Sequence, residues 1–258
     1  MAYRDGGYRG TPAWVGILFV LVLLGYCARL AVNAPATPTT PARAEALLLG
    51  DPAAGALFAT IKRSFPDDFT QARRILMQQA SAGASEAEMN DALLDFLIAA
   101  GRRNMVLAAQ APHAEFAAYR RGEIAVVDAL ARGDLSGCAE YVTKGAIRGT
   151  GGAEVERATI ECRRLSWEAA AAGRDTPAGR SISPPAPAEL SEIGARMRAA
   201  GLTKAEVRAF FDEASLARAK PELQCRWGKA YLTAIDMLPG DRGNAIYAFL
   251  MSQGPPAA

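Results

Sequence analysis

An uncharged apolar run near the N-terminus constrains this chain more than any other feature. Ala13 to Ala28 read AWVGILFVLVLLGYCA, and a snorkelling Arg29 extends the run to about 20 residues. A helix of that length spans the ~30 Å hydrocarbon layer of a bilayer. Trp14 and Tyr26 lie at its two ends, where amphipathic rings favour the membrane interface. The sequence therefore predicts a transmembrane anchor over residues 13–32, with Trp14, Tyr26 and Arg29 at the interface.

Two alternatives to a transmembrane anchor are a lipoprotein signal with lipidation at Cys27 and a signal peptide that is cleaved after the run. A lipidation site needs a small residue directly before the cysteine, and that place is held by Tyr26. A cleaved signal peptide needs a small-x-small site soon after its apolar core. Ala34-Pro35-Ala36 has that spacing, but a proline divides it and it lies beyond Arg29. An uncleaved anchor is the favoured interpretation.

The charges on either side of the run predict its orientation. Arg4 and Arg9 lie in a short tail, residues 1–12, and positive residues favour the cytoplasmic side. Arg29 and Arg43 on the other side of the run reduce the difference in positive charge between its two sides. The excess of arginine over lysine is typical of a GC-rich bacterial genome. We expect a single-pass protein of the bacterial inner membrane with its C-terminal domain in the periplasm.

The composition of the remaining chain is that of a folded, helical protein. Hydrophobic residues make up 50% and charged residues 22%, so enough apolar surface is present for a core. Alanine and leucine dominate, and both favour helices over strands. The net charge is +2 with both signs interspersed, which gives no electrostatic footprint for nucleic acid.

Two proline-rich segments divide the predicted helical region. Residues 33–43 carry a proline at every third position, the repeat of a polyproline II spacer. Residues 174–188 carry four prolines and no apolar period. The sequence therefore predicts a first helical part over 44–173 and a second over 189–253. The second spacer either separates two domains or wraps around one.

Helical periodicity predicts an all-α fold of about nine soluble helices after the anchor. In one example, Phe65, Phe69, Ala72, Leu76 and Ala80 form a single stripe. The next helix follows after a few residues, with Ser85 as its expected cap, so the two should pack as an antiparallel hairpin.

Cys138, Cys162 and Cys225 lie on predicted helices of the soluble region. An oxidising periplasm permits one disulfide among them. Cys138 could pair with Cys162 across the glycine-rich turn at 148–152, or with Cys225 across the second spacer. The third alternative is three buried free thiols.

No motif in the chain indicates a reaction or a cofactor. His113 is the only histidine and follows Pro112 at a helix start, where a capping or surface role is expected, so neither a catalytic triad nor a zinc site is indicated. The glycine-rich Gly149–Glu154 follows a helix rather than a strand, unlike a dinucleotide-binding loop. We predict no catalytic, cofactor-binding or metal-binding residues.

Acidic residues gather in three places that a glycosidase could use as a catalytic pair. These are Asp67 with Asp68, Glu86 with Glu88, and Glu154 with Glu156 and Glu161. Helix starts and solvated faces explain them more simply. We therefore expect a non-catalytic interaction or scaffold module of the bacterial envelope, an accessory subunit that binds the bilayer and an unidentified protein partner. The alternative is an envelope hydrolase that uses paired carboxylates.

Overall fold

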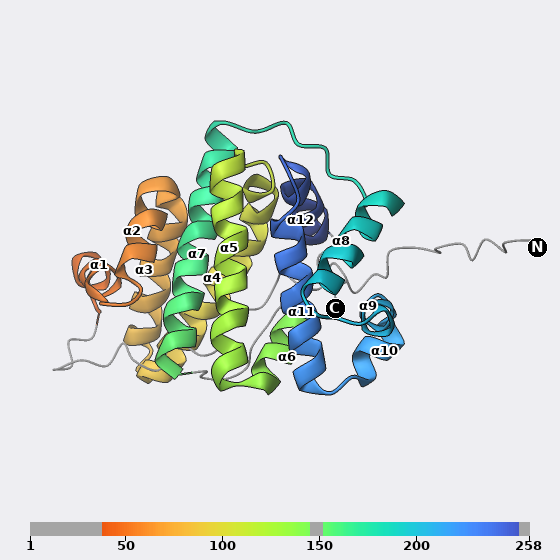
Figure 1. Cartoon of the computed structure of the whole chain (residues 1–258). Coiled ribbons are helices and arrows are strands. Elements are labelled where there is room, and N and C mark those ends of the chain that lie inside the picture. Colours follow the sequence, from red (N-terminus) through yellow and green to blue (C-terminus); the bar gives the residue numbers. More distant parts are fainter. Residues whose placement is uncertain (1–37, 145–151, 253–258) are drawn as a thin grey trace, which may run out of the picture.

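The computed structural model describes residues 38–144 and 152–252, and the secondary structure of this part of the chain consists of helices without strands (Figure 1). The helices are α1 (Pro41–Gly50), α2 (Gly55–Ser64), α3 (Pro66–Ser81), α4 (Glu86–Ala108), α5 (His113–Gly133), α6 (Leu135–Lys144), α7 (Gly152–Asp175), α8 (Pro187–Ala199), α9 (Lys204–Phe210), α10 (Glu213–Arg218), α11 (Pro221–Asp236) and α12 (Arg242–Ser252). The predicted all-α class is confirmed for these residues.

The long helices α4, α5 and α7 form the middle of the molecule (Figure 1). Helices α1, α2 and α3 pack on one side of them, and α6, α11 and α12 pack on the other. Helices α8, α9 and α10 complete the far side, against α11. The order along the molecule therefore largely follows the order along the chain.

Two hydrophobic clusters meet at α7. The first joins α1 to α4 and includes Trp167 of α7, whose ring meets Phe65 edge-on at 4.9 Å between centroids. The second joins the remaining helices and includes Cys162 and Ala169, also of α7. Since α7 contributes to both clusters, it forms a wall shared by the two cores.

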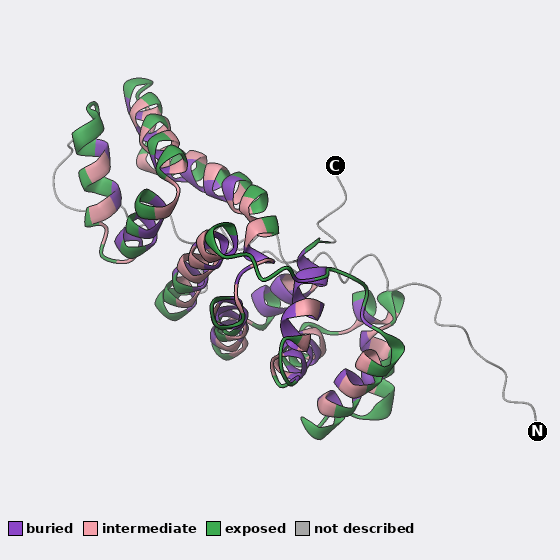
Figure 2. Ribbon diagram, turned by 90° about the horizontal axis from the view of Figure 1, so that it is seen from above, coloured by how far each residue is buried: buried purple, intermediate pink, exposed green. Residues whose placement is uncertain are grey.

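Burial follows one stripe along most of the helices, as Figure 2 shows, but α12 is different. Eight of its residues are buried, from Gly243 to Met251. A helix that is apolar on all sides is stable only when other helices surround it. The last described helix is therefore a central part of the second core.

The predicted stripe and cap of the α3–α4 hairpin are confirmed. Phe69, Ala72, Leu76 and Ala80 are buried on α3. Ser85 caps α4 in a reciprocal capping box with Glu88, in which each side chain binds the other residue's backbone N–H.

The predicted number of helices is wrong, because the described residues form 12 rather than about nine. Two short helices, α1 and α2, precede the stripe of α3 that was predicted as an example. Within the second predicted helical part, the short helices α9 and α10 are separated at Asp212, which caps α10 by accepting from the Ser215 N–H. Helix α1 also begins inside the predicted spacer 33–43, because Pro41 occupies a first-turn position where no N–H is needed and Thr40 caps it.

The second spacer, predicted over 174–188, has neither helix nor strand between the end of α7 and Pro187. Residues from both sides of it, such as Phe116 and Met197, belong to the same hydrophobic cluster. The spacer is held by Arg180, whose side chain is only 2% exposed. Its guanidinium donates to both carboxylate oxygens of Asp241, at 2.7 and 2.9 Å, and lies 5.0 Å from the Phe116 ring centroid.

Arg180 also joins the spacer to the end of α4. Its guanidinium donates to the carbonyl oxygens of Ala109 and Ala111, and its backbone exchanges two hydrogen bonds with the side chain of Gln110. Burial would raise the pKa of Asp241, but the hydrogen bonds from Arg180 and Asn244 lower it to about 2. We call this arrangement of Arg180, Asp241 and Gln110 the clasp.

A disulfide joins Cys138 of α6 to Cys225 of α11, with Cα atoms 5.3 Å apart. Of the alternatives that the sequence leaves open, the structure contains this one, and Cys162 is a buried free thiol. The disulfide and the clasp both connect elements on opposite sides of the second spacer.

Within 38–144 and 152–252, no helix combines the length and the hydrophobicity that a membrane crossing requires. The predicted anchor over 13–32, its interface residues Trp14, Tyr26 and Arg29, and the predicted tail 1–12 lie outside the described residues. The transmembrane anchor therefore stays a prediction.

Candidate functional site

The candidate site is a cluster of buried polar side chains around Glu123 of α5. Tyr119 and Glu123 are one turn apart on the buried face of α5. Tyr141 of α6 and Cys162 of α7 approach the same carboxyl group. Gly122 permits this approach, because a Cβ there would lie only 3.2 Å from the Cα of Cys162.

Both oxygens of the Glu123 carboxyl group accept hydrogen bonds. The phenol of Tyr141 donates to Oε2, and the Cys162 thiol lies 3.4 Å from Oε1. Desolvation raises the pKa of Glu123 to about 7, although hydrogen bonds from Cys162 and Tyr119 and the charge of Arg163 act to lower it. Glu123 can therefore gain or lose a proton near neutral pH.

The thiol of Cys162 has little thiolate character. Desolvation raises its pKa well above the usual value, and the nearby Glu123 carboxylate raises it further. Because the thiolate is the nucleophilic form, a buried thiol of this kind is a poor nucleophile. The cluster is suited to holding a proton rather than to covalent catalysis.

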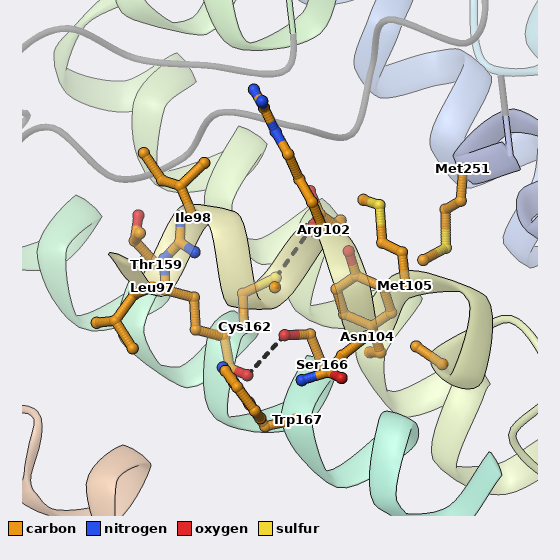
Figure 3. A pocket seen from close by; sticks show the side chains of 15 residues that line it. Leu97, Ile98, Arg102, Asn104, Met105, Thr159, Cys162, Ser166, Trp167 and Met251 are labelled. Atoms are coloured by element: carbon orange, nitrogen blue, oxygen red, sulfur yellow. Dashed lines mark hydrogen bonds between the residues drawn. The ribbon is translucent and has the colours of Figure 1, made fainter. Parts of the chain in front are cut away.

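A cavity of about 60 Å³ reaches this cluster from between α4 and α7. Its apolar wall includes Leu97, Met105 and Trp167, together with Met251 of α12 (Figure 3). Its polar lining includes Arg163 and Thr159 of α7, besides Glu123 and Cys162. A cavity of this size has room for roughly four water molecules, given about one probe sphere for each.

Thr159 is the residue of the cavity lining whose polar group is least explained by the fold. Its side chain is buried, with the residue 7% exposed, and its hydroxyl has no hydrogen-bond partner. Buried hydroxyls nearly always have a partner, because a lost hydrogen bond is not replaced by water. The neighbouring Ser166, by contrast, donates to the backbone carbonyl of Arg163 at 2.8 Å (Figure 3).

The structure does not bring together the residues that were considered for catalysis on sequence grounds. His113 is largely exposed, and its Nδ1 lies 3.3 Å from Asp241 at the clasp, not near a cysteine or serine. In the acidic groups, Asp68 binds Arg103, Glu88 caps α4, Glu154 binds Arg132 and Glu161 binds Arg164. None of these side chains lines the described cavity.

Sequence reasoning missed Glu123, although a signal for it is present. Phe116, Glu123, Val127 and Leu130 fall on one helical stripe of α5, with the carboxylate among apolar residues. A charged residue on an apolar stripe predicts a buried group with a perturbed pKa.

No family model, curated protein or solved structure matches this chain. Among residues 38–144 and 152–252 there is also no group of three or more His, Cys, Asp or Glu side chains that could hold a metal ion. Functional inference therefore depends on the site and the sequence alone.

Proposed function

We propose that this chain is a membrane-anchored helical interaction module of the bacterial cell envelope, an accessory subunit of a membrane complex with its helical domain in the periplasm. The observation that carries the proposal is the Cys138–Cys225 disulfide, because such bonds persist in oxidising compartments. The apolar run at 13–32 supports the same location, since a short basic tail precedes it.

The described residues favour a binding role over a catalytic one. Four of the acidic residues considered for catalysis have structural partners: Asp68, Glu154 and Glu161 bind arginines, and Glu88 caps a helix. The cavity, at about 60 Å³, is small for a polymer substrate.

The surface offers two positions from which a partner can be sought. Val106 is 70% exposed and Met237 60% exposed, the highest values among the large hydrophobic residues described. Val106 lies three residues before Ala109, and Met237 four before Asp241, so both are near the clasp. These two side chains are therefore the first positions at which to test for contact with a partner.

Site-specific photocrosslinking in intact cells tests the proposal. A crosslinking amino acid is placed at Val106 or Met237, with exposed Lys204 and Glu213 on the far side as matched controls. We expect one adduct of the same mass from the two test positions and none from the controls. A chain that forms no adduct from any position, and that purifies alone from crosslinked membranes, would contradict the proposal.

The location needs a separate test. A C-terminal alkaline phosphatase fusion should be active, because that enzyme requires an oxidising compartment to form its own disulfides. The mature chain should keep its N-terminus, as measured by intact mass. An inactive fusion would place the helical domain in the cytoplasm, and a shortened or acylated N-terminus would replace the anchor with one of its two alternatives.

The alternative function, an envelope hydrolase, has one feature in its favour. It requires a desolvated carboxyl group at a cleft, and Glu123 meets that requirement. It also requires a second carboxyl group, and no other acidic residue lines the described cavity. Cell-wall degradation in a gel assay that disappears in Glu123→Gln would favour the hydrolase over the interaction module.

A further inference from the structure

The outward face of α4 carries charges that the fold does not use. Four exposed residues lie at positions i, i+4, i+8 and i+11 and so form one stripe along the helix: Asp91, Asp95, Ala99 and Arg102. In the part of the chain that the structure describes, none of the three charged side chains forms an ion pair. Figure 3 shows the side chain of Arg102 extending away from the other labelled residues of the cavity.

The stability of α4 does not explain these charges. Two carboxylates one turn apart repel each other, so Asp91 and Asp95 together weaken the helix slightly. The helix dipole favours acidic residues in the first turn and basic residues in the last turn, and its effect falls off within those turns. Asp91, Asp95 and Arg102 all lie between the first and last turns of a helix that runs from Glu86 to Ala108. An external partner is therefore the simpler reason for their positions.

The order of the charges makes this stripe complementary to itself. The two acidic residues lie in the N-terminal half of α4, and Arg102 lies in its C-terminal half. In an antiparallel pair of identical helices, the N-terminal half of each faces the C-terminal half of the other. A two-fold symmetric interface must be self-complementary, because the same residues contribute from both copies. The pattern therefore favours a second copy of this chain over a partner of unrelated sequence.

We propose that two copies of this chain form a dimer in which their α4 helices pack antiparallel through this stripe. When Asp95 of one copy lies beside Ala99 of the second copy, Arg102 of the first lies opposite Ala92 of the second. That position is between Asp91 and Asp95 of the second copy, and symmetry repeats the contact. The planar guanidinium of arginine is well suited to binding carboxylates. The small side chain of Ala99 lets the two backbones approach closely.

The contact involves only the middle of α4. From Asp91 to Arg102 the helix rises about 17 Å, at about 1.5 Å for each residue. Packed helices cross at an angle and separate beyond their contact. Val106, one turn beyond Arg102, therefore stays available to the unidentified partner of the proposed function. The dimer requires neither that partner nor the membrane anchor.

Photocrosslinking of the full-length chain in intact cells tests the dimer. A compact diazirine amino acid replaces Ala99, and as a matched control it replaces Ala195, an exposed alanine of α8. We expect an adduct with the mass of two chains from position 99 and none from position 195. The proposal is wrong if position 99 gives no such adduct, gives an adduct with a different protein instead, or gives no more than position 195.

Exchanging the charges tests whether they hold the two copies together. Arg102→Glu makes the stripe wholly acidic, and Asp91→Lys combined with Asp95→Lys makes it wholly basic. Each variant alone should give at least roughly 10-fold less adduct from position 99, because the reversal acts at both symmetric contacts. Arg208→Glu, at an exposed position of α9, should leave the adduct unchanged.

Co-expression of the acidic and the basic variant, each with its own tag, should restore an adduct that carries both tags. Opposite charges then face each other at both contacts. If the adduct persists in a folded Arg102→Glu chain, or if the mixed variants give no more adduct than each alone, the acidic and basic residues do not pair. Circular dichroism shows whether each variant is folded, and the comparison of positions 99 and 195 in the wild-type background decides the matter if one is not.

Discussion

Replacing Glu123 by glutamine should change how the stability of this protein depends on pH. The carboxyl group has a pKa of about 7 in the folded chain and an ordinary value of 4.5. Because the folded-state pKa is the higher one, the folded chain binds more protons between these two values. The free energy of unfolding contributed by Glu123 therefore falls as the pH rises from 4.5 to about 7.

The size of the effect follows from the two pKa values. The difference corresponds to about 3 kcal/mol, at about 1.4 kcal/mol for each pKa unit. Glutamine has almost the same shape as glutamate and cannot ionise. The free energy of unfolding of Glu123→Gln therefore does not decrease in this way as the pH rises. The stability of the variant relative to the wild type should therefore increase by about 3 kcal/mol between about pH 4 and about pH 8.

Urea denaturation of both proteins at several pH values, followed by circular dichroism, measures this difference. Glu115→Gln is a matched control, because Glu115 is on the same helix but exposed. It should follow the wild-type profile. A difference between wild type and Glu123→Gln that stays constant across this pH range would show that Glu123 is not desolvated, and would refute the reasoning.

Three further predictions concern the connections that hold the fold together. Replacing Cys138 and Cys225 by serine should lower the free energy of unfolding by about 2–5 kcal/mol, because the bond spans 87 residues, and unchanged urea midpoints would contradict this. Arg180→Gln should lower the free energy of unfolding by about 2–4 kcal/mol and speed proteolysis within residues 176–186, because Asp241 and two backbone carbonyl groups lose the hydrogen bonds from the guanidinium. An unchanged cleavage rate would count against the clasp. Gly173→Ala should lower thermal stability by about 1–3 kcal/mol, because its Cβ would lie 1.9 Å from the Leu107 carbonyl oxygen. Gly101→Ala, with open space around it, should instead raise stability by about 0.5–1 kcal/mol, and equal effects of the two substitutions would refute the packing argument.

The helices that the sequence predicts well are those whose signals are local. The stripe of α3 and the Ser85 cap of α4 depend on residues three to four positions apart, within one or two helical turns. The short helices α1 and α2 lie almost wholly within the predicted helical part 44–173, but they were not predicted as separate helices, and α1 starts with a proline inside a proline-rich segment. Short helices carry few turns of periodicity, so their pattern is weak.

The polar cluster around Glu123 was not predicted, because its members come from three different helices. Glu123 comes within hydrogen-bond distance of Tyr141 and Cys162 only when α6 and α7 pack against α5. Spacing along the chain contains no information about such distances. The clasp was not predicted for the same reason, because Arg180 and Asp241 are separated by 61 residues along the chain.

The sequence by itself determined the helical class, the main amphipathic faces and the predicted anchor over 13–32, because these depend on composition and on periodicity within single segments. Only the tertiary structure decided which cysteine pairs with Cys138 and which carboxyl group is desolvated. A pKa shift and a disulfide both require particular groups to be brought together or removed from water. That is a property of how helices pack, so it appears only when the whole fold is assembled.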